Sequence, residues 1–351
     1  MTIYKELDVA IQDMQSQNVL YQPSSFWADA SEKIVGEICT YGIDKFRSLP
    51  KPLGFFVPSY GSPGNSFNKD AVQSLLVFCA KEFSQAPKNL QALDQFLSGY
   101  NAANADYRVL QAADDINKKP YLHRFSESSY GAPVEQWAFD GKKYSRSALN
   151  YALGLTFLKR HIGQSKIQTV IEIGGGFGTL GELLLSDDTN QIKYIDIDIP
   201  PTSFVAQQYL TARFGSENVA GYASLRDKET IAINALPKAS VMTSWQIEKL
   251  TGNADLFVNF ISFQEMEPEI VQNYLNHVDR LQTTWILLRN MREGKQIYKE
   301  GSHVGVKIPI KTDDYLNMLP NYTLVEKNVV PFGYKTVDGF HSELVLLKRK
   351  G

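Results

Sequence analysis

A glycine cluster between two apolar segments constrains the fold of this chain more than any other feature. Residues 170–181 read Val-Ile-Glu-Ile-Gly-Gly-Gly-Phe-Gly-Thr-Leu-Gly, and Glu-Leu-Leu-Leu follows at 182–185. The first part is typical of a buried strand and the last part of a helix. Glycines suit the turn between them, because a ligand can approach a backbone that has no Cβ and because such turns need positive φ angles. The segment therefore predicts a strand, a ligand-binding turn and a helix.

Two registers of these glycines predict two different cofactors. Gly176, Gly178 and Gly181 satisfy the G-x-G-x-x-G pattern of dinucleotide enzymes, which places a pyrophosphate at a helix N-terminus. In the other register, Glu172 opens the pattern E-x-G-x-G-x-G. A carboxylate at that place suits a ligand with a cationic amino-acid end and would repel a pyrophosphate, so we favour this register. The residues predicted to hold the cofactor from this turn are Glu172, Gly174, Gly175, Gly176 and Gly178.

A second acid is expected after the next strand. Both kinds of cofactor carry a ribose, whose hydroxyls are bound by a carboxylate about twenty residues beyond the glycines. Residues 193–200 read Lys-Tyr-Ile-Asp-Ile-Asp-Ile-Pro. Strand alternation points Asp196 and Asp198 to the same side, which leaves both open as the ribose ligand. We favour Asp198, which stands directly before Ile-Pro.

Length and composition predict an enzyme-sized globular protein. The chain has 351 residues, with 43% hydrophobic and 21% charged side chains, which is ordinary for a globular protein of more than one domain. We predict a mainly helical N-terminal region at residues 1–120, serving as a lid, for substrate binding or for dimerisation. A cofactor-binding domain is predicted at residues 121–351.

Charge and cysteine content exclude several classes of protein. The formal net charge is -2 and lysines and arginines are scattered, so nucleic acid is not an expected partner. Cys39 and Cys79 have no metal-ligand spacing, which predicts neither a disulfide framework nor a zinc site. No apolar segment approaches the ~20 residues of a membrane span, and no signal sequence is expected at the N-terminus. We predict a cytoplasmic protein.

From residue 167 the chain alternates strand-like and helix-like segments, as in a parallel sheet covered on both faces. Strands are predicted at 169–173, 192–197, 219–223, 255–262 and 284–288. Helices are predicted after a Ser145 cap, from Thr202 to a stop at Gly215, and from Pro268. Segments 322–330 and 342–347 predict a terminal antiparallel pair around 331–339. In the N-terminal region, 70–83 and 90–100 predict helices, and the Pro- and Gly-rich segment 49–68 predicts a loop, hinge or lid.

The two acidic motifs carry a family resemblance. The pattern from Glu172 to Gly178 resembles motif I of the class I S-adenosylmethionine-dependent methyltransferases, and Asp198-Ile-Pro200 resembles a segment of several small-molecule O-methyltransferases. Over roughly residues 120 to 350 the chain is similar to a bacterial family of sugar O-methyltransferases associated with surface-polysaccharide biosynthesis. Further segments that carry this resemblance are 127–133, 198–201, 209–210, 259–266 and 288–290.

The resemblance implies a fold and an activity. The fold is a Rossmann-like, doubly wound α/β sheet that ends in an antiparallel hairpin. The cofactor is S-adenosylmethionine, and the reaction is methyl transfer to a hydroxyl of a sugar or sugar-containing metabolite. No metal is implied, and a homodimer is possible.

A sugar hydroxyl is a poor nucleophile while it is protonated, so a base should stand within hydrogen-bond reach of it. Glu265 is the leading candidate because it follows the fourth strand, at the edge where ligands bind in open α/β sheets. A carboxylate there could instead cap the following helix. His123 and His341 are further candidates, since imidazole titrates near neutral pH, although a loop histidine is more often a surface residue.

Other polar and aromatic residues are predicted around the acceptor. Ser262 is expected to contact the methionine part of the cofactor, and Asn259 is expected either at the same edge or as a satisfied core amide. Glu127 and Tyr130 belong to a polar, aromatic loop that is a candidate active-site element. Arg289 could hold a phosphate or carboxylate of the substrate or form a surface ion pair, and the same holds for Arg292.

Two rival functions remain open. The first is an NAD(P)-dependent oxidoreductase that uses the G-x-G-x-x-G register, which Glu172 and the terminal hairpin pattern disfavour. The second is a non-catalytic binding module that keeps the fold. The intact glycine motif with both acids argues against it, because a module without cofactor would not need them.

Overall fold

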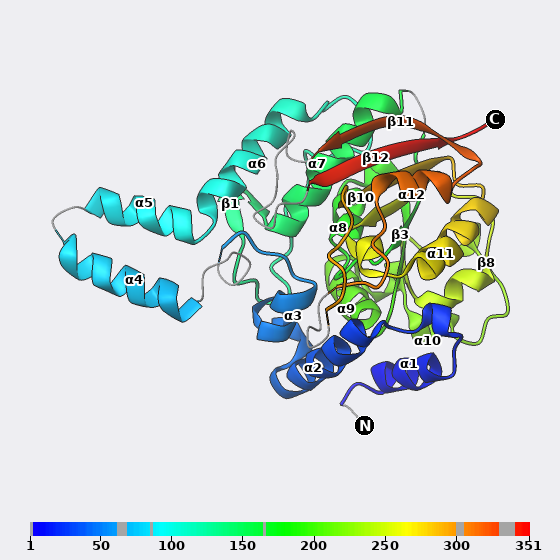
Figure 1. Cartoon of the computed structure of the whole chain (residues 1–351), viewed down its shortest axis with the longest axis horizontal. Helices are drawn as coiled ribbons and strands as arrows, with labels where there is room; N and C mark the ends of the chain where they lie inside the picture. Colours follow the sequence, from blue (N-terminus) through cyan, green and yellow to red (C-terminus); the bar gives the residue numbers. More distant parts are fainter. Residues whose placement is uncertain (1–2, 62–68, 85–86, 164–165, 300–304, 330–340) are drawn as a thin grey trace.

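An eight-stranded sheet forms the centre of the molecule (Figure 1). The computed structural model describes residues 3–61, 69–84, 87–163, 166–299, 305–329 and 341–351. The strand order is β11-β12-β10-β9-β3-β4-β7-β5. Strand β12 is antiparallel to both of its neighbours, β10 and β11, and the other neighbouring strands pair in parallel. The strands are β3 (Thr169–Ile173), β4 (Lys193–Asp198), β5 (Val219–Ala220), β7 (Ala239–Thr243), β9 (Leu256–Phe260), β10 (Trp285–Met291), β11 (Tyr322–Val329) and β12 (Ser342–Arg349). The predicted α/β class and the terminal antiparallel pair are confirmed, while the segment that joins this pair lies outside the described residues.

Helices cover both faces of this sheet, and strand alternation divides the apolar core between them. Val170 packs in the core with α7 (Arg146–His161), α8 (Thr179–Leu185) and α9 (Thr202–Phe214). Its neighbour Ile171 packs in the other core, with α10 (Tyr222–Leu225), α11 (Pro268–Arg280) and α12 (Thr312–Asn317). Strands buried on both faces explain why 170–173 reads as an almost unbroken apolar run.

Several helix ends follow the predicted signals. The Ser145 side chain accepts a hydrogen bond from the Ala148 N–H at the start of α7. Gly215 ends α9 and Pro268 opens α11. These boundaries are confirmed because each depends on a local capping preference, which the sequence displays directly.

The third predicted strand was misplaced. Residues 219–223 contribute only the two-residue edge strand β5, and the strand beside β4 is β7. All five residues of β7 are buried, but they read Ala-Ser-Val-Met-Thr, so small and polar side chains hide the strand pattern. Two smaller sheets, outside the central one, pair β1 (Trp137–Phe139) with β2 (Lys142–Tyr144) and β6 (Ile231–Ala232) with β8 (Leu250–Thr251).

The N-terminal region contributes helices that lie against the sheet-bearing part and a pair of helices that projects from it (Figure 1). These helices are α1 (Lys5–Gln15), α2 (Ser25–Tyr41), α3 (Pro50–Phe55), α4 (Lys69–Glu82), α5 (Pro87–Leu97) and α6 (Tyr100–Ala113). Short 3-10 helices occupy Val19–Tyr21, Ile43–Ser48, Asp188–Asn190, Ser216–Asn218, Ile233–Ala235, Ser244–Lys249 and Ser262–Glu265. The helices predicted at 70–83 and 90–100 correspond to α4 and α5. The loop predicted at 49–68 is wrong at its start, because a proline in the first turn is compatible with helix α3.

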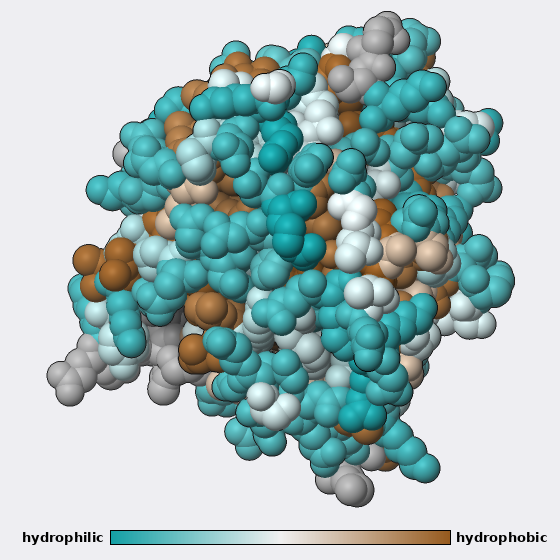
Figure 2. Space-filling model, turned by 90° about the vertical axis from the view of Figure 1, so that its right-hand side faces the viewer, coloured by the Kyte–Doolittle hydropathy of each residue, from teal (hydrophilic) through white to brown (hydrophobic). Residues whose placement is uncertain are grey.

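The projecting pair α4 and α5 exposes apolar side chains, including Val77 and Phe78, which are 61% and 58% exposed. By contrast, hydrophilic residues cover most of the face shown in Figure 2, on the side of the molecule away from this pair. Within the described part of the chain, no helix has both the length and the apolar composition needed to cross a membrane.

A buried ion pair fixes the N-terminal region to the sheet-bearing part. Arg47 is 1% exposed, and its Nη2 lies 2.9 Å from Glu127 Oε1. Its Nη1 donates to the Ser128 carbonyl at 2.9 Å, and its guanidinium lies 5.1 Å from the centre of the Phe177 ring. Glu127 also accepts a hydrogen bond from Ser145 Oγ at 2.6 Å. One carboxylate therefore links the N-terminal region, the loop before β1 and the start of α7.

Replacing Glu127 by alanine should lower the free energy of unfolding by about 3–5 kcal/mol, because it leaves the Arg47 charge buried without a partner. Urea denaturation followed by circular dichroism measures this loss. A Lys33→Gln variant is the control, since it removes the exposed pair with Asp29 and should cost less than about 1 kcal/mol. Equal losses in the two variants would contradict this assignment.

Candidate active site

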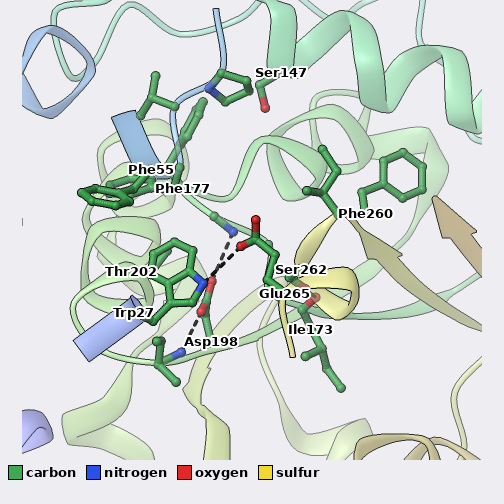
Figure 3. A pocket seen from close by; sticks show the side chains of 18 of the residues that line it. Trp27, Phe55, Ser147, Ile173, Phe177, Asp198, Thr202, Phe260, Ser262 and Glu265 are labelled. Carbon is green, nitrogen blue, oxygen red and sulfur yellow. Dashed lines mark hydrogen bonds between the residues drawn. The ribbon is translucent and has the colours of Figure 1, made fainter. Parts of the chain in front are cut away.

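A cavity of about 470 Å³ lies at the carboxyl ends of β3, β4 and β9. Its floor consists of residues 173–177, 197–199 and 260–262, which follow those three strands. Its roof consists of residues 22–24, Trp27 and residues 53–59, all from the N-terminal region. Figure 3 shows Trp27 and Phe55 of the roof on one side of the cavity and Ser262 and Ile173 of the floor on another. Part of the segment predicted as a hinge or lid thus covers a cavity, and residues 62–68 lie outside the described residues.

The glycine turn forms the centre of the floor. Gly174, Gly176 and Gly178 have φ angles of 73°, 64° and 89°. A Cβ on Gly174 would collide with the Ser262 side chain, and a Cβ on Gly175 would lie 2.5 Å from Asp196 Oδ1. Gly174, Gly175 and Gly176 line the cavity, whereas Gly178 precedes α8 and faces Leu210 outside it. The turn needs glycine both for its backbone conformation and for its close approach to the groups beneath it.

Glu172 lies beneath this turn rather than in the cavity. It is fully buried, and its two carboxyl oxygens accept hydrogen bonds from Tyr151 at 2.7 Å and from Tyr194 at 2.5 Å. Burial raises the pKa of Glu172 to about 7, against the effect of the two tyrosine hydrogen bonds. The expected direct contact with a cationic ligand is therefore not seen. The acid supports the turn from below, because both of its oxygens are already bonded to tyrosines.

The structure separates the two aspartates that the sequence left open. Asp198 lines the cavity and accepts hydrogen bonds from the backbone N–H of Ile199 at 2.7 Å and of Gly176 at 3.3 Å (Figure 3). Burial raises the pKa of Asp198 to about 7. Asp196 is fully buried outside the cavity, and burial together with the charges of Glu172 and Asp198 raises its pKa well above the usual value. No group of three or more His, Cys, Asp or Glu side chains in the described segments is arranged to hold a metal ion.

Ser262 reaches the cavity and Asn259 stands behind it. Ser262 Oγ donates to the Ile173 carbonyl at 3.1 Å and accepts from Asn259 Nδ2 at 2.6 Å. Asn259 is fully buried, and its Oδ1 accepts from the Phe263 N–H at 3.3 Å. Asn259 is therefore a satisfied core amide, as the alternative prediction had it, and its expected place at the substrate is not seen.

Glu265 connects the floor of the cavity to its roof. Its Oε2 accepts a hydrogen bond from Trp27 Nε1 at 3.1 Å, which Figure 3 shows across the cavity. Its Oε1 lies 2.7 Å from Lys295 Nζ. The carboxylate is thus held between an indole of the N-terminal region and an ammonium group that follows β10. Of the three predicted catalytic residues, only Glu265 lines the cavity.

The two predicted histidines lie elsewhere. The side chain of His123 is 47% exposed, and its Nε2 lies 3.9 Å from Asp187. His341 lies at the start of β12, where its Nδ1 contacts Glu293 and Arg292. Neither histidine lines the cavity. Their ionisation suggested a catalytic role, but their places in the fold do not support it.

Two further residues that the sequence predicts at the substrate also lie outside the cavity. Glu127 is committed to the ion pair with Arg47. Tyr130 packs its ring against Phe46 and Tyr209, with ring centres 6.5 and 6.4 Å apart. Both stabilise the contact between the N-terminal region and the sheet-bearing part.

Arg289 lines the cavity, as do several residues that the sequence does not indicate as site residues. These are Arg146, Asn150 and Tyr151 on α7, and Trp27 in the roof. Arg146 follows directly after the Ser145 cap, but nothing in the sequence indicates that the start of α7 reaches β10. A shared cavity between residues this far apart in the chain has no local sequence signal.

Comparisons with known proteins find similarity to solved structures at low sequence identity. No family model and no curated protein sequence matches it. It is similar to magnesium protoporphyrin IX methyltransferase from Synechocystis PCC 6803, solved with bound SAM, with a TM-score of 0.38, 12% identity, and coverage of 58% of this chain and 79% of that one. It is also similar to 1,6-didemethyltoxoflavin-N1-methyltransferase from Burkholderia thailandensis, with a TM-score of 0.41, 13% identity, and coverage of 59% of this chain and 79% of that one. For mitomycin 7-O-methyltransferase the TM-score is 0.36 and the identity 14%, and 57% of each chain is covered. Because these TM-scores lie below 0.5, we infer the function from the geometry of the cavity.

The buried Glu172 makes stability depend on pH. Its folded-state pKa of about 7 exceeds the ~4.3 of an unfolded glutamate. Its contribution to the free energy of unfolding is therefore complete below about pH 4 and is lost as the pH rises through about 7. We expect Glu172→Gln to reduce the fall in unfolding free energy between about pH 5 and about pH 8 by on the order of 1–3 kcal/mol. Urea denaturation of both proteins at the two pH values measures this difference in unfolding free energy.

The matched control is Glu32→Gln, which changes an exposed carboxylate and should keep the full pH dependence. If Glu172→Gln shows the same pH dependence as the wild-type protein, the proton that is lost as the pH rises is bound to Asp196 or Asp198 and not to Glu172.

Proposed function

We propose that this chain is an S-adenosylmethionine-dependent O-methyltransferase. The observation that carries this proposal is the floor of the cavity, where a glycine turn with positive φ angles runs beside the Asp198 carboxylate. The turn offers close backbone approach, and the carboxylate offers an acceptor for ribose hydroxyls. The strand order also fits the fold that the sequence resemblance implies, because the sheet ends in the antiparallel strands β12 and β11.

The residues present fit such a cofactor. Asp198 would accept hydrogen bonds from the ribose, and Gly174 to Gly176 with Ser262 would contact the methionine part. Ile199, Ile270 and Tyr274 provide an apolar surface beside Asp198 for the adenine. When bound, S-adenosylmethionine supplies a methyl group activated by its attachment to a sulfonium.

The protein's own contribution is positioning, exclusion of water and removal of one proton. The roof residues cover the floor, which keeps an acceptor oxygen oriented and shielded. Glu265 is our candidate for the group that receives the hydroxyl proton of the acceptor, since it is the only predicted base in the cavity.

The nature of the acceptor is a finer proposal. A sugar or sugar-containing metabolite, methylated in the cytoplasm during surface-polysaccharide synthesis, is supported by the sequence resemblance alone. The homodimer also remains a prediction. The exposed apolar side chains of α4, among them Leu75, Val77 and Phe78, are the surface that we propose for it.

Calorimetric titration with S-adenosylhomocysteine tests the cofactor, with NAD as the control ligand. We expect binding of the former alone, and loss of binding in Gly176→Val, whose β-branched side chain cannot adopt a φ of 64° without strain. Asp198→Ala should weaken binding by about 1–3 kcal/mol more than Asp196→Ala, because only Asp198 faces the cavity. Binding of NAD alone, or equal losses in the two aspartate variants, would overturn the proposed site.

Glu265→Gln tests the proposed base. We expect the affinity for S-adenosylhomocysteine to change little and methyl transfer to fall by roughly 10²-fold or more, as for loss of a general base. Release of S-adenosylhomocysteine in the presence of a glycan-precursor extract measures transfer. Trp27→Phe is the matched variant, since it removes a hydrogen bond to the same carboxylate and should cost much less. If cofactor affinity falls in parallel with transfer, Glu265 only fastens the roof.

A further inference from the structure

Arg289 brings a positive charge to the cavity and forms no ion pair with any described residue. The residue lies on β10, is 8% exposed, and lines the cavity. Its Nε is buried without a hydrogen-bond partner, and none of the ion pairs between described residues includes it. The ring centre of Phe260 lies 5.9 Å from its guanidinium carbon. A buried cation without a partner is costly, which points to a ligand.

A second guanidinium stands nearby. Arg146 also lines the cavity, where it donates to the Ser59 carbonyl at 2.7 Å and lies 5.4 Å from the centre of the Tyr60 ring. Burial and the charge of Arg146 lower the pKa of Arg289 to about 10, well below that of an ordinary arginine. Two like charges therefore share this end of the cavity.

The acids nearest to this end are engaged with other groups. Asp106 accepts a hydrogen bond from the Tyr60 hydroxyl. Glu135 Oε2 accepts from the backbone N–H of Tyr60 at 2.6 Å and of Gly61 at 2.8 Å. Burial raises the pKa of Glu135 to about 7 and that of Asp106 above its usual value. Neither carboxyl forms an ion pair with Arg289 or Arg146 in the described structure. The charge of Asp106 acts on both guanidiniums from a greater distance, so the positive charge is only partly offset.

Strand order separates this end from the proposed ribose site. Asp198 ends β4 and Arg289 lies on β10, and the order β10-β9-β3-β4 places two strands between them. Three strand spacings amount to about 14 Å. The proposed cofactor site consists of Asp198 at one end and the glycine turn in the middle of the cavity. The two arginines lie at the other end, which is therefore left for the acceptor.

We propose that Arg289 and Arg146 bind an oxyanion, a carboxylate or a phosphate, on the acceptor molecule. The acceptors are then acidic or phosphorylated sugars rather than neutral glycans. A guanidinium matches either group with paired hydrogen bonds, and arrival of the anion supplies the partner that Arg289 lacks. This inference rests on the proposed function, because it assigns the other end of the cavity to the cofactor.

The test is thermal unfolding of the full chain saturated with S-adenosylhomocysteine, in the presence of inorganic phosphate, glucose 1-phosphate, glucuronate or, as the neutral control, glucose. We expect an anion-dependent rise in unfolding temperature and none with glucose. A rise with phosphate and glucose 1-phosphate alone identifies a phosphate site, and a rise with glucuronate alone identifies a carboxylate site. No rise with any of the three anions would overturn the inference.

Arg289→Met separates binding from structure. We expect this variant to lose the anion effect, with an anion affinity at least about tenfold weaker. Its unfolding temperature without ligand should stay equal or rise, because a buried unpaired charge has been removed. Arg292→Met is the matched control, since that arginine is 41% exposed, contacts Glu293 and lies outside the cavity. It should keep the anion effect.

Two further outcomes are decisive. If Arg289→Met weakens S-adenosylhomocysteine as much as the anions, the arginines hold the cofactor's own carboxylate and the inference is wrong. If the wild-type protein binds no S-adenosylhomocysteine, the proposed function fails instead. A lower unfolding temperature of Arg289→Met without ligand would then show independently that Arg289 is structural.

Discussion

The cavity depends on a backbone that passes directly over two buried carboxyl groups. Gly175 lies so close to Asp196 and Glu172 that a single added carbon would collide with both. Glu172 in turn binds the hydroxyls of Tyr151 from α7 and Tyr194 from β4. One acid therefore lies beneath the glycine turn and connects β3 to α7 and to β4. Because burial favours the protonated form of these carboxyls, the arrangement does not require a buried counter-ion.

The two ends of the cavity differ in chemistry. At one end, a carboxylate and backbone N–H groups face an apolar surface, which suits a nucleoside. At the other end, the Arg289 guanidinium stands beside Phe260, whose ring stacks on Tyr151 with centres 4.9 Å apart. The Arg146 guanidinium lies over the ring of Tyr60. The floor between them comes from the sheet and the roof from the N-terminal region. The lining of the cavity is thus divided between parts of the chain that are far apart in sequence.

Features with a local signal could be predicted from the sequence. The glycine turn, the Ser145 cap and the Pro268 helix start each follow from residues within a few positions of one another. The sequence does not predict strand β7, because its small and polar residues lack the apolar pattern of a buried strand. Glu127 is predicted at the substrate because it belongs to a polar, aromatic loop. Its partner Arg47 lies 80 residues away in the chain, and no local pattern reveals such a pair. His123 and His341 are predicted as bases from the pKa range of imidazole alone, but both lie outside the cavity.

The roof has a consequence for the order in which the molecule is built. Trp27 and Tyr21 leave the ribosome before any strand of the central sheet, yet their partners Glu265, Ser244 and His277 are made more than two hundred residues later. These two residues can therefore form their contacts only after more than two hundred further residues have been synthesised. Closing loops of this length is entropically costly and slow, so the cavity should be among the last parts of the protein to form.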